Sequence, residues 1–160
     1  MLTWLSEMGG LTNKYLEDLT RRFVRNNFVG VFPSDAAPKI QKKNFSIIYN
    51  LSKHFEAGTH FIAIMKVGEK MIYFDSLGEK CSNHDINSFM KQFNIPIILS
   101  KRKIQHNFSN FCGYYCFYFI YYCFFLGNSL PNFLKLFSKN DLKQNDSLLL
   151  SFILKSINKH

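Results

Sequence analysis

Cysteine is scarce in this sequence, and acidic residues are few. The chain has four cysteines in 160 residues, too few and too closely grouped for the disulfide framework of a small secreted protein. Cys112 and Cys116 lie near each other, but no paired C-x-x-C spacing of a zinc site occurs. Motifs of helix-turn-helix, zinc-finger and RNA-recognition modules are missing as well. We therefore expect a reduced intracellular protein without a disulfide scaffold or a metal site.

Basic residues outnumber acidic ones by 20 to 11, which gives a net charge of +9. The basic runs at 41–43 and 101–103 are each able to contact a phosphate backbone, although one such run alone is more often solvated surface. For the chain as a whole, the excess favours weak, salt-sensitive and non-specific binding to DNA. We therefore expect DNA as a partner.

Long apolar segments are also few. The run FCGYYCFYFIYYCFFL at 111–126 is shorter than the roughly 18–20 residues that cross a bilayer, and its tyrosines and cysteines suit lipid poorly. We expect a buried central helix that is apolar on all sides because the rest of the domain surrounds it. The segment Met1–Trp4 lacks the basic and apolar regions of a secretory signal, so we expect no leader and no membrane contact.

The remaining pattern predicts one α+β domain over residues 1–160, without repeats or low-complexity linkers. A content of 47% apolar residues excludes a disordered chain. Helices are expected at 1–27, 85–93, 111–126, 132–137 and 147–157, and strands at 28–33, 45–51, 60–67, 71–75 and 96–99. Thr12 or Asn13 is the predicted cap of the first helix. Residues 68–70 form the turn of a predicted antiparallel hairpin.

Cys112 is the first candidate for chemistry. It follows the polar loop 103–110 at the start of the predicted central helix, where free backbone amides and the helix dipole favour a thiolate. Cys116 and Cys123 lie deeper in the apolar run, where burial favours the neutral thiol, and we interpret them as small core residues. Cys81 lies in a polar loop and is interpreted as incidental. Taken alone, Cys112 would also be interpreted as a packing residue more often than as a nucleophile.

A thiolate nucleophile needs a base, and His60 opens the predicted strand 60–67. Asp75 ends the partner strand of the hairpin. Because antiparallel strands place the start of one beside the end of the other, the pattern brings Asp75 next to His60, where a triad requires a carboxylate. Gln105, on the loop before Cys112, carries a neutral amide that would hold an oxyanion together with the Cys112 backbone N–H.

In this order the four residues resemble the site of the adenain family of viral cysteine proteases and, more distantly, that of the SUMO-deconjugating peptidases. The matching segments are Gly58-Thr59-His60-Phe61, Tyr73-Phe74-Asp75-Ser76-Leu77-Gly78, and Gln105 through Cys112-Gly113-Tyr114-Tyr115-Cys116. The resemblance covers about residues 28–126. It implies an α+β cysteine-protease fold, in which a central buried helix carries the nucleophile and packs against a mixed or antiparallel sheet flanked by helices.

Three features depart from adenain. Phe61 follows the histidine where the family commonly has tryptophan. Asp75 is the acid of the deconjugases, whereas adenain has glutamate. Adenain is activated by a peptide joined through a disulfide to a cysteine shortly before its glutamine, but no cysteine lies between Cys81 and Cys112. The resemblance therefore implies the site more strongly than it implies this mode of activation.

The resemblance implies a cysteine endopeptidase that cleaves viral capsid or core precursors during virion maturation, after small residues such as Gly-Gly or Gly-Xaa-Gly. Its catalytic residues would be His60, Asp75, Gln105 and Cys112, with no cofactor required for the chemistry and with DNA as an activator. It would act as a monomer at viral assembly sites in the host cytoplasm or nucleus, and be packaged in the virion. Two alternatives stay open. The site could remove a ubiquitin-like modifier, or the chain could be a basic nucleic-acid-binding scaffold that keeps only the fold.

Overall fold

The structure, a computed structural model, describes residues 11–51 and 60–160. Its centre is a five-stranded sheet with the strands in chain order. The strands are β1 (Phe28–Pro33), β2 (Phe45–Asn50), β3 (Phe61–Val67), β4 (Lys70–Phe74) and β5 (Ile97–Leu99). The strands β2, β3 and β4 pair antiparallel, whereas β1 and β5 pair parallel to their neighbours. The sheet is therefore mixed, and the predicted α+β class is confirmed.

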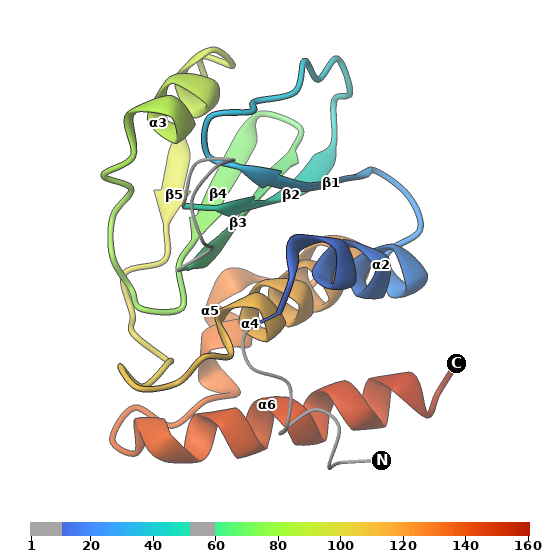
Figure 1. Ribbon diagram of the computed structural model, residues 1–160, viewed down its shortest axis with the longest axis vertical. Coiled ribbons are helices and arrows are strands. Elements are labelled where there is room, and N and C mark those ends of the chain that lie inside the picture. Colours follow the sequence, from blue (N-terminus) through green and yellow to red (C-terminus); the bar gives the residue numbers. More distant parts are fainter. Residues whose placement is uncertain (1–10, 52–59) are drawn as a thin grey trace.

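Helices cover both faces of this sheet. They are α2 (Asn13–Phe23), α3 (His84–Lys91), α4 (Cys112–Phe119), the π-helix η1 (Ile120–Phe125), α5 (Leu130–Lys135) and α6 (Leu142–Ile157). In Figure 1, α3 lies on one face, α2, α4 and α5 lie on the other, and α6 runs across the outer side of α4. Neighbouring strand residues alternate between two cores: Ile47 packs with the core of α3, and Ile48 packs with the core of α4. Every residue of β2 is buried as a result.

The predicted central helix starts at Cys112, and every residue of α4 is buried. The prediction of a fully buried helix to residue 126 is wrong at its end: the chain continues as the π-helix η1, and Phe125 and Leu126 are exposed. There the Leu126 N–H donates to the Tyr121 carbonyl at 2.9 Å. Because a π turn holds more residues than an α turn, it changes which side chains of this aromatic run face the core.

Within residues 11–51 and 60–160, no helix combines the length and the apolar composition that crossing a bilayer requires.

The other elements match their predictions with shifted bounds. The first helix ends at Phe23 and not at residue 27, and its predicted residues 1–10 lie outside the described part of the chain. Thr12 is the cap, because its Oγ1 accepts a hydrogen bond from the Tyr15 N–H at 3.2 Å. The last helix begins at Leu142 and not at residue 147, since Asp141 caps it by accepting a hydrogen bond from the Gln144 N–H. The predicted hairpin is confirmed as the antiparallel pair β3 and β4.

Candidate active site

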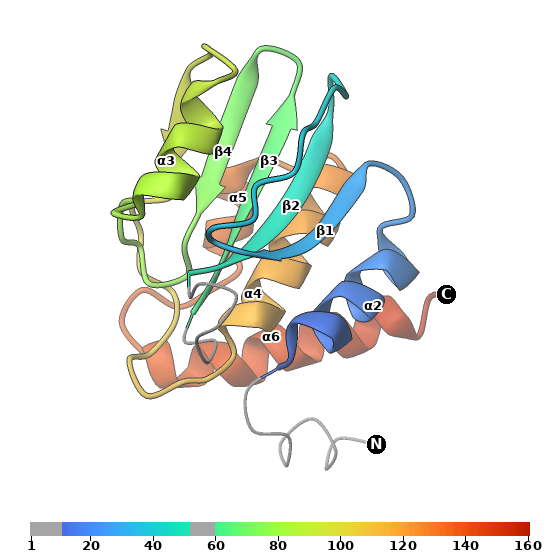
Figure 2. The ribbon, with the colours of Figure 1, turned by 45° about the horizontal axis from the view of Figure 1, so that its top comes forward.

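Three segments of the chain meet at one end of the sheet. His60 directly precedes β3, Asp75 directly follows β4, and Cys112 is the first residue of α4. The antiparallel pairing of β3 with β4 places the start of one strand beside the end of the other. Figure 2 shows the N-terminal end of α4 near this end of the sheet. The tertiary structure thus gathers residues that the sequence separates.

His60 and Asp75 form a buried pair. The Nε2 atom of His60 lies 2.8 Å from Oδ1 of Asp75, and the two side chains are only 15% and 3% exposed. The same Oδ1 accepts a hydrogen bond from the Leu77 N–H at 2.8 Å. The Asp75 backbone N–H donates to Oγ of Ser100 at 3.0 Å. The carboxylate is therefore held toward the imidazole by backbone and side-chain contacts, at the position that the hairpin pattern predicts.

The start of α4 packs against the start of β3, since a Cβ at Gly113 would lie 3.4 Å from Cδ2 of Phe61, and this places Cys112 near the imidazole. Burial lowers the pKa of His60, but the hydrogen bonds to Asp75 and Cys112, together with their negative charges, outweigh it and raise that pKa from 6.5 to about 10. The imidazolium is therefore the stable form at neutral pH, and an adjacent cation favours the thiolate form of a cysteine.

The start of α4 suits a negative charge at Cys112. The preceding residue, Phe111, provides no side-chain cap, so the first-turn amides keep their partial positive charge for another acceptor. Gly113 lets α2 approach this turn closely. A Cβ at Gly113 would lie 2.9 Å from Cδ1 of Leu11 and 3.2 Å from Cδ2 of Leu16. Tight packing therefore holds Gly113, the residue after Cys112, in place.

The other three cysteines have different surroundings. Burial raises the pKa values of Cys81 and Cys116, and it raises the pKa of Cys123 to about 12. None of the four cysteines is in a disulfide. Cys116 and Cys123 are buried in the core around α4, as their positions in the apolar run predict. These three thiols are thus neutral at physiological pH.

Gln105 lies on the loop between β5 and α4, and its side-chain amide is fixed at both ends. Its Oε1 accepts a hydrogen bond from Oγ of Ser76 at 2.5 Å, and its Nε2 donates to the Ser109 carbonyl at 2.8 Å. The residue is only 2% exposed. One N–H of Nε2 is used in this way, and the described residues supply no acceptor for the other. A rigid amide donor thus lies on the loop that leads to Cys112.

Sequence reasoning missed the residues that anchor this loop. Asn145 of α6 is fully buried and donates from Nδ2 to the Ile104 carbonyl at 2.8 Å. It also donates to the Ser138 carbonyl and accepts a hydrogen bond from the Ser138 N–H. These bonds tie the residue before Gln105 to the C-terminal helix. No motif indicated them, because Asn145 and Ile104 are 41 positions apart.

Arg102 anchors the same loop to α5. Its guanidinium donates to the carbonyls of Leu134 and Phe137, each at 2.6 Å. Two N–H groups of the only arginine in the basic run 101–103 therefore bind backbone carbonyls at and just after the end of α5. The loop also passes close to Gly78, where φ is +71° and a Cβ would lie 2.6 Å from the Lys103 nitrogen. Glycine is required at that crossing.

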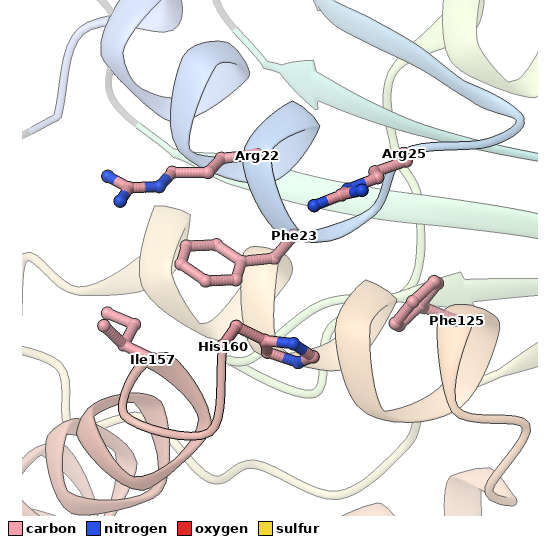
Figure 3. A pocket seen from close by; sticks show the side chains of 6 residues that line it. All are labelled: Arg22, Phe23, Arg25, Phe125, Ile157 and His160. Atoms are coloured by element: carbon pink, nitrogen blue, oxygen red, sulfur yellow. The ribbon is translucent and has the colours of Figure 1, made fainter.

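A pocket of about 490 Å³ shares no residue with this site (Figure 3). It is lined by Arg22, Phe23, Arg25, Phe125, Ile157 and His160. The lining comes from the C-terminal ends of α2, η1 and α6. Because helix C-termini carry partial negative charge, cationic side chains are favourable there for structural reasons. Among the described residues, its lining includes neither a carboxylate side chain nor a thiol.

Neither a protein-family model nor a curated protein sequence matches this chain. Among solved structures, the ASFV pS273R protease is similar, with a TM-score of 0.61 and 16% identity over 90% of this chain and 66% of that protein. The Chlamydia trachomatis effector protein Cdu1, solved bound to ubiquitin, has a TM-score of 0.48 and 15% identity over 71% of this chain and 60% of its own. The chain thus spans less than two thirds of either protein. The first likeness shows that the chain shares the fold of that protease, and this agrees with the fold that the motif resemblance implies.

Proposed function

We propose that this protein is a cysteine endopeptidase in which Cys112 is the nucleophile, His60 its acid and base, and Asp75 the carboxylate that orients the imidazole. The observation that carries the proposal is the buried His60–Asp75 pair, with 2.8 Å between Nε2 and Oδ1, beside a cysteine that begins a buried helix. The raised pKa of His60 supports it, because a thiolate needs a cationic partner at neutral pH.

In the proposed mechanism, the Cys112 thiolate attacks the scissile carbonyl carbon. The oxyanion of the tetrahedral intermediate accepts hydrogen bonds from Nε2 of Gln105 and from the Cys112 backbone N–H. The imidazolium of His60 protonates the leaving amine, the C–N bond breaks, and a thioester remains on the sulfur. Neutral His60 then takes a proton from water, whose oxygen attacks the thioester. The thiolate leaves, and the imidazolium is restored for the next cycle.

For the substrates, we propose viral capsid or core precursors cut after small residues such as Gly-Gly or Gly-Xaa-Gly during virion maturation at assembly sites. The motif resemblance over residues 58–61, 73–78 and 105–116 supports this assignment. The net charge of +9 supports DNA as an activating partner that binds through its backbone phosphates.

A second function on the same site is hydrolysis of the bond that joins a ubiquitin-like modifier to its target. Asp75 favours it, because the deconjugases have aspartate where adenain has glutamate. A panel of fluorogenic peptides with Gly-Gly or Gly-Xaa-Gly before the cut, set against a folded ubiquitin-like fusion, separates the two functions. We expect turnover of the peptides, whereas cleavage of the fusion alone would favour the deconjugase.

The nucleophile is testable without a known substrate. Iodoacetamide alkylation of the native protein, read for each cysteine by mass spectrometry, should modify Cys112 rapidly at about pH 6, well below the usual thiol pKa of roughly 8.5. His60→Ala should abolish this fast reaction. Cys81, Cys116 and Cys123 should react slowly, because burial raises their pKa values. Slow alkylation of all four thiols, with and without DNA, would contradict the proposal and favour the scaffold alternative.

Cleavage provides the second test. Cys112→Ala should abolish turnover of every peptide in the panel. Cys81→Ala is the matched control, because Cys81 is a free thiol remote in sequence from α4, and this variant should keep wild-type activity. Turnover that survives in Cys112→Ala would remove this cysteine from the mechanism.

A further inference from the structure

Ser76, which follows the acid of the site, has no role in the mechanism above. It is nevertheless fully buried, and its hydroxyl donates to Oε1 of Gln105 at 2.5 Å. Its carbonyl accepts hydrogen bonds from the backbone N–H groups of Ile104 at 2.9 Å and of Gln105 at 3.0 Å. Ser76 therefore binds Gln105 through both its side chain and its backbone.

We propose that Ser76 is a positioning residue that sets the orientation of the Gln105 amide for the oxyanion; this proposal rests on the proposed peptidase function. A glutamine amide accepts hydrogen bonds at Oε1 and donates two at Nε2. The Ser76 hydroxyl occupies Oε1, and the Ser109 carbonyl, which only accepts, occupies one N–H of Nε2. The second N–H is then left for the substrate.

The Ser76 hydroxyl also makes the second N–H of Gln105 Nε2 a stronger hydrogen-bond donor. A hydrogen bond to an amide oxygen polarises the group, so its N–H becomes a better donor in a buried site. Without this bond, Oε1 would be a buried acceptor with no partner, and the amide would gain by turning toward water. Turning moves the second N–H away from the oxyanion.

Asp75 and Ser76 thus serve the two halves of the site from adjacent positions. Asp75 reaches His60, which transfers protons, and Ser76 reaches Gln105, which stabilises the oxyanion. This role explains why Ser76, the residue after Asp75, is buried with its hydroxyl bound to Gln105. In contrast, Ser46 on β2 is equally buried, but the described residues give its hydroxyl no partner.

Two reactions of the same sulfur separate positioning from a general structural role. Acylation of Cys112 by p-nitrophenyl acetate passes through an oxyanion, whereas alkylation by iodoacetamide displaces iodide at a saturated carbon and forms none. Ser76→Ala should slow acylation at least about tenfold and leave the alkylation rate within about twofold of wild type, a pattern that a structural defect would not give. Ser46→Ala, the matched control, should leave both rates unchanged.

Gln105→Ala completes the comparison. It should slow acylation on the order of a hundredfold. Because Ser76 acts through Gln105, Ser76→Ala should add no further loss in that background. If Ser76→Ala folds poorly, Ser76→Cys carries the same test, since it keeps a weak donor of similar size and should give an intermediate acylation rate.

The outcomes distinguish the two proposals. Wild-type acylation in Ser76→Ala, or losses that multiply in the double variant, would overturn the positioning role while Cys112 stays an activated nucleophile. A wild-type protein whose Cys112 is not selectively alkylated would instead overturn the peptidase function, and the positioning role with it.

Discussion

Replacing Asp75 with asparagine removes the negative charge that keeps His60 protonated. The two charged atoms lie 2.8 Å apart, and both side chains are largely buried. At an effective dielectric constant of about 20, opposite charges about 3 Å apart attract by about 5.5 kcal/mol. That energy corresponds to about 4 pKa units, of which burial cancels a part. We therefore expect Asp75→Asn to lower the pKa of His60 from about 10 by at least about 2 units.

The consequence for activity has a definite sign. The imidazolium is present below the pKa of His60 and is lost above it, so the alkaline limb of the kcat/KM profile should lie near pH 10 in the wild type. In Asp75→Asn this limb should move down to about pH 7–8. At about pH 8, cleavage should fall on the order of 10²–10⁴-fold, because the variant loses both the protonated acid and the orientation of the ring.

Two measurements check this expectation. NMR titration of the His60 ring reports its pKa directly, and steady-state kinetics across pH reports the alkaline limb. Asp85→Asn is the matched control, because Oδ1 of Asp85 lies 3.8 Å from Nδ1 of His84 in an exposed pair, and its loss should change neither result. An alkaline limb and a His60 titration that stay unchanged in Asp75→Asn would refute the reasoning.

Three further predictions concern the loop and the partner. Asn145→Ala should lower kcat more than it changes KM and reduce the free energy of unfolding by about 1–3 kcal/mol, because the Ile104 carbonyl loses its buried donor. Steady-state kinetics and urea unfolding measure these two effects, and an unchanged kcat together with an unchanged unfolding free energy would contradict the anchoring role. Gly78→Ala should lower the unfolding free energy by more than about 1 kcal/mol, whereas Gly68→Ala, with φ +58° and open space at its Cβ, should cost less; equal losses would show that the crossing loop tolerates the methyl group. Adding DNA should raise the cleavage rate, and a higher salt concentration should reverse this increase. A cleavage rate that changes with neither DNA nor salt would show that DNA is not an activator.

Local pattern predicted the elements that carry the candidate site. The apolar run at 111–126 indicated a helix with no solvated face, and α4 is buried along its whole length. The hairpin around residues 68–70 brought His60 and Asp75 together, because an antiparallel pair dictates which ends are neighbours. The change to a π-helix after Phe119 had no signal in the apolar pattern, since all the residues of this run are apolar or aromatic.

The sequence by itself determined which segments form strands and helices and which two strand ends meet, because these follow from side-chain periodicity and a short turn. Only the tertiary structure decided the surroundings of Gln105. Its bond to Ser76 joins residues 29 positions apart, and the bond from Asn145 to Ile104 joins residues 41 apart. No local period encodes such pairs. Buried polar groups take the partners that packed segments bring to them, so these contacts are decided only when β4, the loop after β5 and α6 pack together.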